Sequence, residues 1–432
     1  MRFVDFRFEG FKSLRDVSLE LGDVTVVTGP NGAGKTNLAE ALTFLSEALH
    51  YGLEIAVARA GGFANIAHHG PAGDAHEVGF RFLADLNLSE VARSRRIVRS
   101  DENEEDLSLT LIYHVKIVQD GNDGPSNFKI GYEYLELADD DGKLVTAKRT
   151  EGGVVKFRRS RRIKSRRTPL YSALYPLSED DFIQFAKARA DSTTLIVQAV
   201  AMTSNLFSLL ALELGQLRVF QLSPQLCRKP GISAPQALLS RHGENLPAVV
   251  DNLKRTTPMI WKKVMSGMRT VLPKLDDIDT SFTEDRRLSL IFKFLDSGRA
   301  WNANEMSDGT MQALALFVAL FDARCPLLIV EEPENALHPW ILRHFLDLCR
   351  EQKRKQILLT THSPIVIDYS APKDLCIMWN RNGESNISPV LELSPEVVEL
   401  WRSGEVTGFN IYDSGFILEY LPEEFVPAGV EE

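Results

Sequence analysis

Cysteine is scarce in this sequence of 432 residues. The four cysteines have neither the close spacing of a zinc site nor the paired spacing of a disulfide framework; they are Cys227, Cys325, Cys349 and Cys376. We therefore expect reduced, mostly buried thiols in a cytoplasmic protein. The N-terminus also lacks a charged-then-apolar leader pattern, because Met1–Asp5 already has the mixed character of a strand.

Long hydrophobic runs are missing as well. The most apolar stretch, residues 194–215, is interrupted by polar side chains at Gln198, Thr203, Ser204, Asn205 and Glu213. It is too polar for a membrane span and fits a buried helix better, so no membrane partner is expected. Residues 178–275 show no sustained heptads and the chain has no repeats at solenoid periods, which argues against a long coiled coil and a repeat array.

Positive charge is in deficit overall, since the formal net charge is −10. This balance argues against nucleic-acid binding by the whole surface. The segment Lys143–Arg167 is an exception in which Glu151 is the only acid, and its densest part holds Arg158, Arg159, Arg161, Arg162, Lys164, Arg166 and Arg167. Three interpretations stay open for it: contacts with DNA or RNA phosphates, a solvated loop with a charge run, and docking of an acidic protein.

The clearest positive signal is a glycine-rich run that matches G-x-x-x-x-G-K-[ST] at every fixed position: Gly29, Pro30, Asn31, Gly32, Ala33, Gly34, Lys35 and Thr36. A β-type run, Val24–Thr28, precedes it, and helical spacing follows it. In that context the loop amides and the helix N-terminus bind phosphate, Lys35 reaches the β- and γ-phosphates, and Thr36 places its hydroxyl on Mg²⁺. We therefore expect ATP and Mg²⁺ as ligands, with Asn37 beside them.

The hydrophobic pattern divides the chain into five consecutive parts. We expect a first lobe with the phosphate loop at 1–90, an appended antiparallel β region at 91–177, a helical insertion at 178–275, a second lobe at 276–395 and a C-terminal tail at 396–432. Helices alternate with apolar strands in the second lobe, which predicts a mainly parallel sheet there and an α/β fold class.

Two apolar strands of the second lobe end in polar residues. Leu327–Val330 is followed by Glu331 and Glu332, and Ile357–Thr361 is followed by His362. In a phosphoryl-transfer site the first acid supports Mg²⁺ and the second orients or deprotonates the attacking water. An imidazole at the carboxyl end of a parallel strand is placed to donate to a γ-phosphate. The alternatives are a polar strand end that caps the next helix and a structural histidine.

A further motif precedes the apolar helix that starts at Met311. Ser307 stands where a helix N-cap is expected. The functional interpretation is that this helix N-terminus, with Ser307, Asp308 and Gly309, receives a γ-phosphate.

In combination these motifs resemble the ABC-type ATPase head of the SMC/RecF superfamily, and most closely its compact bacterial AAA-type branch related to the OLD and abortive-infection defence ATPases. The residues that carry the resemblance are Phe11–Ser13, Gly29–Thr36, Met306–Thr310, Glu331–Pro339 and Thr361–Ser363. They cover residues 1–70 and 300–380. The resemblance implies a P-loop NTPase fold with a mixed sheet, an antiparallel β subdomain and a helical insertion.

The resemblance also implies how such a site works. Two heads associate head to tail around two ATP molecules, and larger oligomers can follow. Each ATP contacts the phosphate loop of one head, including Lys35, and the Ser307–Gly309 segment of the other. Glu332 is then the catalytic base of a slow ATPase, and His362 is its switch histidine.

The sequence departs from the family pattern at several positions. Asp308 and Thr310 replace a glycine and the glutamine of the usual L-S-G-G-Q signature, and Glu331 stands where Asp is commoner. No convincing Q-loop glutamine is present; His68–His69 occupy roughly that region. Lys12 is a further candidate for contact with the nucleotide base or phosphates.

No cluster of acids follows His362, so a fused nuclease is not expected. We expect an ATPase of a bacterial anti-phage defence or toxin–antitoxin type system that senses a trigger and controls a separately encoded effector. The alternatives are a DNA-repair or maintenance ATPase that acts directly on DNA and a non-enzymatic, nucleotide-gated scaffold.

Overall fold

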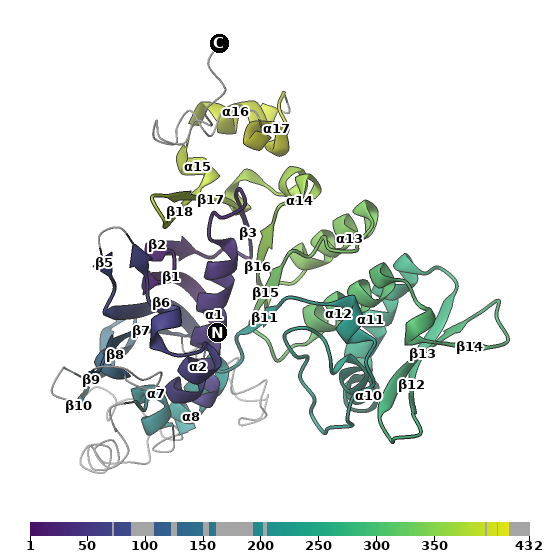
Figure 1. The fold of residues 1–432 in the computed structure, drawn as a ribbon, viewed down its shortest axis with the longest axis horizontal. Helices are drawn as coiled ribbons and strands as arrows, with labels where there is room; N and C mark the ends of the chain where they lie inside the picture. The colour runs from purple at the N-terminus through teal and green to yellow at the C-terminus, as the bar shows by residue number, and fades with distance from the viewer. Residues whose placement is uncertain are drawn as a thin grey trace. The chain divides into compact units, whose positions relative to one another are not determined.

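The computed structural model describes residues 1–70, 73–87, 108–121, 128–149, 155–160, 193–201, 205–393, 395–403 and 405–413 (Figure 1). The chain divides into two compact units whose segments interleave along the sequence. Unit 1 consists of Met1–Gly22, Asn31–Leu217 and Met378–Ile387, and unit 2 consists of Asp23–Pro30, Arg218–Ile377 and Ser388–Glu432. None of the described helices combines the length and apolar character needed to span a bilayer.

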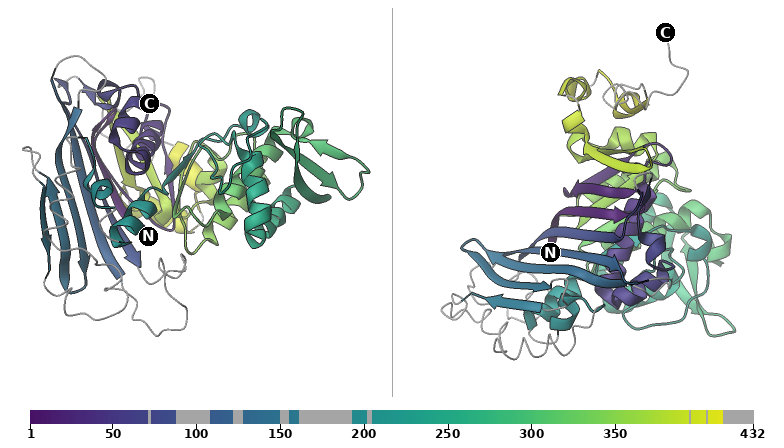
Figure 2. Two further views of the ribbon diagram at one scale, coloured as in Figure 1. Left: turned by 90° about the horizontal axis from the view of Figure 1, so that it is seen from below. Right: turned by 60° about the vertical axis from the view of Figure 1, so that its left-hand side comes forward.

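Unit 1 is built on an antiparallel sheet of seven strands in the order β10-β9-β8-β7-β6-β1-β2. These strands are β1 (Arg2–Phe11), β2 (Leu14–Glu20), β6 (Glu77–Asn87), β7 (Ser108–Gln119), β8 (Phe128–Asp139), β9 (Gly142–Arg149) and β10 (Val155–Arg159). The short strands β4 (His69–Gly70) and β5 (Gly73–Asp74) form a separate pair. The described helices of the unit lie on one face of the large sheet (Figure 2); they are α1 (Lys35–Tyr51), α2 (Leu53–Arg59), α3 (Phe63–Ile66), α7 (Ile196–Val200) and α8 (Asn205–Leu214).

Phenylalanine rings form the core between this sheet and α1. Side chains alternate along a strand, so Phe6 and Phe8 of β1 share a face with Phe80 and Phe82 of β6. The ring centroids of Phe6 and Phe82 lie 5.9 Å apart, and those of Phe44 on α1 and Phe80 lie 5.3 Å apart. Burying one such ring stabilises the fold by on the order of 2–3 kcal/mol. This packing fixes α1, which begins at the end of the glycine-rich loop.

The sheet of unit 2 has the order β11-β15-β16-β3-β17-β18. Its strands are β3 (Val24–Thr28), β11 (Arg218–Phe220), β15 (Leu327–Glu331), β16 (Gln356–Thr361), β17 (Leu375–Arg381) and β18 (Glu384–Pro389); the end of β17 and most of β18 belong to unit 1. The pairs β11/β15, β15/β16, β16/β3 and β3/β17 are parallel. Every residue of β3, β15 and β16 is buried, as expected for central strands of a parallel sheet.

The rest of unit 2 is helical apart from one small sheet. Its helices are α9 (Pro224–Cys227), α10 (Leu246–Thr256), α11 (Pro258–Val271), α12 (Asp308–Phe321), α13 (Pro339–Arg350), α14 (Pro364–Tyr369), α15 (Val390–Leu393), α16 (Pro395–Ser403) and α17 (Gly408–Asp413). Two 3₁₀ turns are η2 (Ala303–Glu305) and η3 (Pro372–Asp374). The small antiparallel sheet contains β12 (Leu275–Phe282), β13 (Leu288–Phe294) and β14 (Ala300–Asn302).

The α/β fold class and the mainly parallel sheet predicted from the sequence are confirmed. Two expectations differ from the structure. The described strands of the region 91–177, β7 to β10, do not form a sheet of their own, because β7 pairs with β6 and β6 with β1, so that one antiparallel sheet continues from β10 to β2. The expected helical region 178–275 contains the strand β11, whose three residues are too few to show a period. The five-part division stays a prediction, and residues 161–192 and 414–432 lie outside the described part of the chain.

Candidate functional site

The glycine-rich loop joins the end of β3 to the first turn of α1. Gly32 and Gly34 have φ angles of 80° and 106°, in the left-handed region that favours glycine. No side chain caps the N-terminus of α1, and its first turn contains no acidic residue. The amides of this turn and the positive end of the helix dipole therefore fit a phosphate group. Lys35 is buried, whereas Thr36 is exposed.

Close packing inside unit 1 adds a second reason for glycine at position 34. A Cβ atom on Gly34 would lie 2.0 Å from the hydroxyl of Ser385. The Ser385 Oγ atom lies 2.7 Å from the Oγ of Ser13, which accepts a hydrogen bond of 2.6 Å from Asn37 Nδ2. The phosphate loop thus packs against Ser385 of β18 and against Ser13 in the turn after β1.

Lys12 and His68 lie at the same turn of unit 1. Lys12 has φ of 46° and forms an ion pair with Glu40 on α1. His68 is buried and its Nδ1 atom contacts the carbonyl of Lys12. Lys12, Ser13 and His69 line a cavity of about 370 Å³. Lys12 therefore lies at a hollow, whereas His68 supports the backbone of the turn.

The strand register of unit 2 brings three of the predicted motifs to one edge. Parallel pairing sets Glu331 of β15 opposite Thr360 of β16, and Thr361 opposite Thr28 of β3. The Thr28 hydroxyl donates a hydrogen bond of 3.1 Å to the Thr361 carbonyl. The start of the glycine loop, the two acids and His362 therefore leave the carboxyl edge of adjacent parallel strands, where α/β sheets bind ligands.

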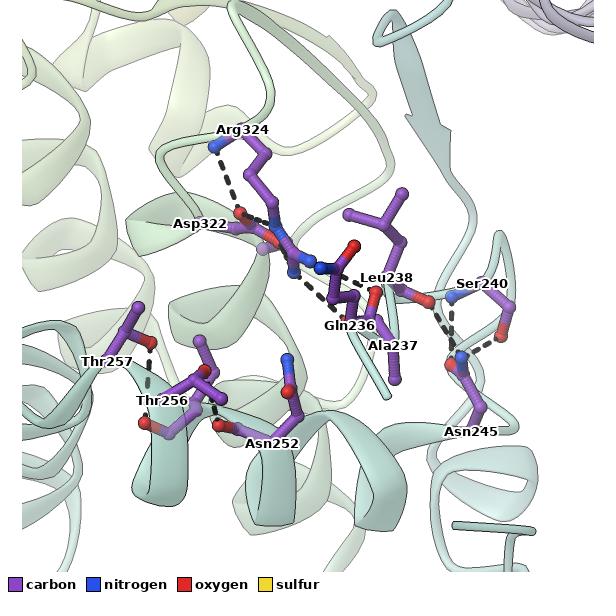
Figure 3. A network of polar contacts seen from close by, with 12 residues as sticks. Gln236, Ala237, Leu238, Ser240, Asn245, Asn252, Thr256, Thr257, Asp322 and Arg324 are labelled. Carbon is purple, nitrogen blue, oxygen red and sulfur yellow. Dashed lines mark hydrogen bonds and ion pairs between the residues drawn. The ribbon is translucent and has the colours of Figure 1, made fainter. Parts of the chain in front are cut away.

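Glu331 is held by an arginine that the sequence did not indicate. Its side chain is 4% exposed and accepts a hydrogen bond of 3.0 Å from Arg241 Nη2. The loop before α10 that carries Arg241 is fixed from both sides (Figure 3): Arg324 donates to the carbonyls of Gln236 and Ala237, and Asn245 donates to that of Leu238. The carboxylate of Glu331 is thus buried and held in one orientation.

Glu332 has an unusual backbone. Its φ angle of 47° is rare for a residue with a side chain. Its N–H donates to the Thr360 carbonyl at 2.8 Å, and its carboxylate accepts a hydrogen bond of 3.0 Å from Asn335 Nδ2. Glu332 as a whole is half-buried, and it follows the last residue of β15. Backbone strain of this kind gathers at functional sites.

Glu334 connects the acidic motif to the segment of His362. One oxygen of its carboxylate accepts hydrogen bonds from the Thr361 hydroxyl at 2.8 Å and from the His362 N–H at 2.9 Å. The other oxygen is buried and has no hydrogen-bond partner within the described residues. Glu334 therefore fixes the backbone at His362, which is itself half-buried.

The Ser307–Gly309 segment is exposed at the start of α12. Ser307 is the N-cap, and its hydroxyl accepts a hydrogen bond of 3.3 Å from the Thr310 N–H. Asp308 forms an ion pair of 2.5 Å with Arg228. A Cβ atom on Gly309 would lie 2.7 Å from the Ala336 carbonyl oxygen. Glycine is required here because the segment packs directly on the backbone that follows Glu332 to Asn335.

The residues present fit a nucleotide with Mg²⁺. No group of three or more His, Cys, Asp and Glu side chains that could hold a metal occurs in the described part of the chain. Mg²⁺ is usually bound by one or two protein groups together with substrate phosphates and water. The hydroxyl of Thr36 and the carboxylate of Glu331 are both oxygen groups of the type that Mg²⁺ binds.

The predicted basic cluster is described only in part. Arg158 and Arg159 belong to β10, and the side chain of Arg158 is exposed. The remaining members lie outside the described residues; they are Arg161, Arg162, Lys164, Arg166 and Arg167.

Three residues of the site were not found from the sequence. Glu334 lies two residues after Glu332, and this position in the acidic motif could have identified it as a residue of the site. Arg241 and Ser385 lie far along the chain from Glu331 and Gly34, and no local pattern marks them.

Comparison with known proteins shows that the sequence matches one protein family. Residues 24–368 match the family model described as "AAA domain, putative AbiEii toxin, Type IV TA system". No protein of the curated set matches the sequence significantly.

Solved structures with a similar fold include three SMC head domains. That of Thermotoga maritima is 14% identical, with 90% of this chain and 99% of that chain covered and a TM-score of 0.40. The Smc head domain of Pyrococcus furiosus, with an extended coiled coil and bound to the C-terminal domain of ScpA, is 14% identical, with 93% and 99% covered and a TM-score of 0.46. The Smc head domain of Pyrococcus yayanosii, with a coiled coil and joint, is 11% identical, with 94% and 100% covered and a TM-score of 0.43. The likeness is distant.

Proposed function

The chain belongs to the AAA-domain family of the putative AbiEii toxin and type IV toxin–antitoxin systems, and from that membership we propose that it binds ATP with Mg²⁺, hydrolyses it, and associates with a second copy while ATP is bound. The observation that carries the proposal is the register of β3, β15 and β16, which aligns the loop start, Glu331 and Thr361 at one sheet edge.

The phosphate loop binds the substrate in this proposal. Amides of Gly32 to Thr36 and the N-terminus of α1 hold the phosphates, and Lys35 provides a positive charge for the β- and γ-phosphates. Thr36 and Glu331 would hold Mg²⁺. When bound, the ion neutralises charge on the phosphate oxygens. Lys12 lies in unit 1 at the cavity of about 370 Å³ and is the candidate for contact with the base or phosphates.

Glu332 is the proposed catalytic base. A water molecule attacks the γ-phosphorus, the bond to the β-phosphate oxygen breaks, and the carboxylate of Glu332 accepts the proton of the water. Asn335 orients that carboxylate through its hydrogen bond. Glu334 holds the backbone of His362, whose imidazole then donates to the γ-phosphate.

Association of two copies is supported by the exposed start of α12. Ser307 and Asp308 are exposed, and Gly309 is half-buried. A helix N-terminus at the surface attracts an anion. In a head-to-tail pair, this segment of one copy would meet the γ-phosphate held by its partner, so that ATP lies between the copies.

The family description supports a proposal for the role in the cell. We infer a component of an anti-phage defence or toxin–antitoxin type system that responds to a trigger and controls a separate effector protein. A second candidate is a maintenance ATPase that acts on DNA directly, which the cations of β10 favour. An ATPase assay with and without duplex DNA, at low and moderate salt, separates the two; stimulation that weakens with salt supports the second candidate.

The ATPase proposal is tested with two variants and a control. Lys35→Ala should abolish nucleotide binding, because the cation for the phosphates is lost. Glu332→Gln should keep ATP binding, lower the turnover rate by roughly 10²- to 10⁴-fold, and accumulate an ATP-bound dimer in light scattering. Glu351→Gln, which changes an exposed acid after α13, should behave like the unmodified protein. Normal turnover by Glu332→Gln would refute the base, and tight ATP binding by Lys35→Ala would refute the loop.

A further inference from the structure

The described helices of unit 1 cover one face of its large sheet (Figure 2). The strand register places a row of cationic and aromatic side chains on the opposite face. Because paired residues of neighbouring strands point to the same face, the register defines the row directly. From β10 to β1 it runs through Lys156, Lys148, Tyr134, His114, Arg81 and Arg7. Strands lie about 4.8 Å apart, so the row is roughly 25 Å long.

The charge on this face is unequal at its two ends. At the β1 end, Arg7 forms ion pairs with Glu9 and Asp16, and Lys116 with Glu9 and Glu77. These acids balance the cations there, so a net positive potential does not arise at that end.

At the β10 end the cations exceed the acids. Five cations surround a depression of about 550 Å³: Lys143, Lys148, Lys156, Arg158 and Arg159. None of the described residues that line the depression is acidic. Nearby, Glu136 forms an ion pair with Lys143, and Asp139–Asp141 lie at the β8–β9 turn. Lys148, Lys156 and Arg158 are exposed. In a chain with a net charge of −10, such a local excess attracts a densely charged anion.

Aromatic rings lie among these cations. Tyr134 lines the depression, and Tyr132 stands two residues earlier on the same face of β8, roughly 7 Å away along the strand. The ammonium of Lys148 lies 5.2 Å from the ring centroid of Tyr132, and that of Lys143 lies 6.0 Å from that of Tyr134. Both tyrosines are half-buried, and cations beside such rings combine phosphate attraction with a stacking surface.

We propose that the β8-β9-β10 end of this sheet face binds single-stranded nucleic acid, with phosphates on Lys148, Lys156 and Arg158 and a base stacked on Tyr134. Unpaired bases reach an aromatic ring on a sheet, whereas a duplex keeps its bases stacked inside. An acidic peptide offers the charge without planar bases for the rings. The proposal does not depend on the ATPase proposal, because its readout is binding without nucleotide.

The test is fluorescence anisotropy of the full chain with a labelled single-stranded oligonucleotide, the same sequence as a duplex, and a polyglutamate peptide. The single strand should bind tightest, with an affinity that falls as salt rises. Tighter binding of the duplex or the peptide would overturn the proposal. Lack of salt-dependent binding would also overturn the proposal. The cations would then have a different role, which is to keep the edge strand β10 from pairing with strands of other chains.

Variants locate the site. Reversing three charges with Lys148→Glu, Lys156→Glu and Arg158→Glu should reduce affinity by roughly tenfold or more and lower the slope of log affinity against log salt by about 2. Tyr134→Ala should weaken binding roughly tenfold, whereas Tyr134→Phe should retain it.

A matched triple variant is the control. Lys262→Glu, Lys263→Glu and Lys353→Glu reverse three exposed charges of unit 2 and change the net charge equally. This control should keep the affinity within about twofold, apart from the screened effect of net charge. An equal loss in both triples would show that net charge alone acts and would overturn the site.

Discussion

At the scale of single residues, Gly309 allows two motifs to pack closely because it has no side chain; they are the start of α12 and the segment after Glu332. Its backbone approaches the Ala336 carbonyl so closely that a Cβ atom would lie 2.7 Å from the oxygen. Ala336 itself has φ of 62°, so the backbone there is already strained and cannot give way easily. The exposed start of α12 and the segment after Glu332 are therefore mechanically linked inside unit 2.

We predict that Gly309→Ala impairs the protein through this contact. The methyl group forces the two segments apart, and overpacking of this kind costs about 1–3 kcal/mol. The free energy of unfolding should fall by that amount and ATP turnover should fall with it. Gly298→Ala is the control, because nothing lies within 4 Å of a Cβ atom there. Equal stability of the two variants would contradict the link.

Glu332 allows a second prediction at this scale. Its positive φ destabilises the fold, and glycine tolerates that conformation. Glu332→Gly should therefore unfold with a free energy about 1 kcal/mol higher than Glu332→Ala, although both lack the carboxylate and should not hydrolyse ATP. Urea unfolding of the two variants checks this. If alanine were the more stable, the strain at this position would be unimportant.

At the scale of elements, a buried polar group joins α7 to the large sheet of unit 1. Glu133 on β8 is fully buried and accepts hydrogen bonds from the Tyr113 hydroxyl at 2.6 Å and the Ile196 N–H at 2.5 Å. Arg149 on β9 lies 3.5 Å from its other oxygen and donates to the Thr194 carbonyl. Burial raises the pKa of Glu133 to about 7, although Arg149 and these hydrogen bonds act in the opposite direction.

This pKa predicts a dependence of stability on pH. Between about 4.5 and about 7 the native state keeps a proton on Glu133 that the unfolded state releases. The free energy of unfolding should therefore fall as pH rises through this window, by up to roughly 3 kcal/mol, and level off above it. Glu133→Gln should remove this dependence in urea unfolding at pH 5 and 7.5, whereas Glu284→Gln, at an exposed position, should retain it. An unchanged pH dependence in Glu133→Gln would contradict the assignment.

The same elements show how far the sequence could predict the fold and the site. Short continuous apolar runs predicted β3, β15 and β16, and an N-cap before an apolar helix predicted α12, because buried strands and capped helices leave local patterns. The strand β11 left no such pattern, since its three residues depend on pairing with β15. The contact of Arg241 with Glu331 joins residues 90 positions apart, and only the folded chain brings them together.

At the scale of the whole molecule, every cysteine is buried within its unit. Burial raises the pKa of the Cys227 thiol to about 12 and that of the Cys325 thiol to about 11, and it also raises the pKa of Cys349. The thiolate is the reactive form, so these groups should be inert in the native protein.

Alkylation tests this expectation. Native protein treated with iodoacetamide at pH 8 should show no adduct by mass spectrometry over the time in which denatured protein gains four. A single rapid adduct on native protein would indicate that one thiol is accessible.

The interleaving of the two units bears on synthesis of the chain. The strand β3 leaves the ribosome well before its neighbours β16 and β17, which are made more than 300 residues later. At 5–20 residues per second this delay is roughly 15 to 60 s. During it, Val24–Thr28 is an uncharged, β-branched segment without its partners, which is the type of segment that aggregates. This central strand of the unit 2 sheet is therefore a part of the nascent chain that we expect to need protection by a chaperone.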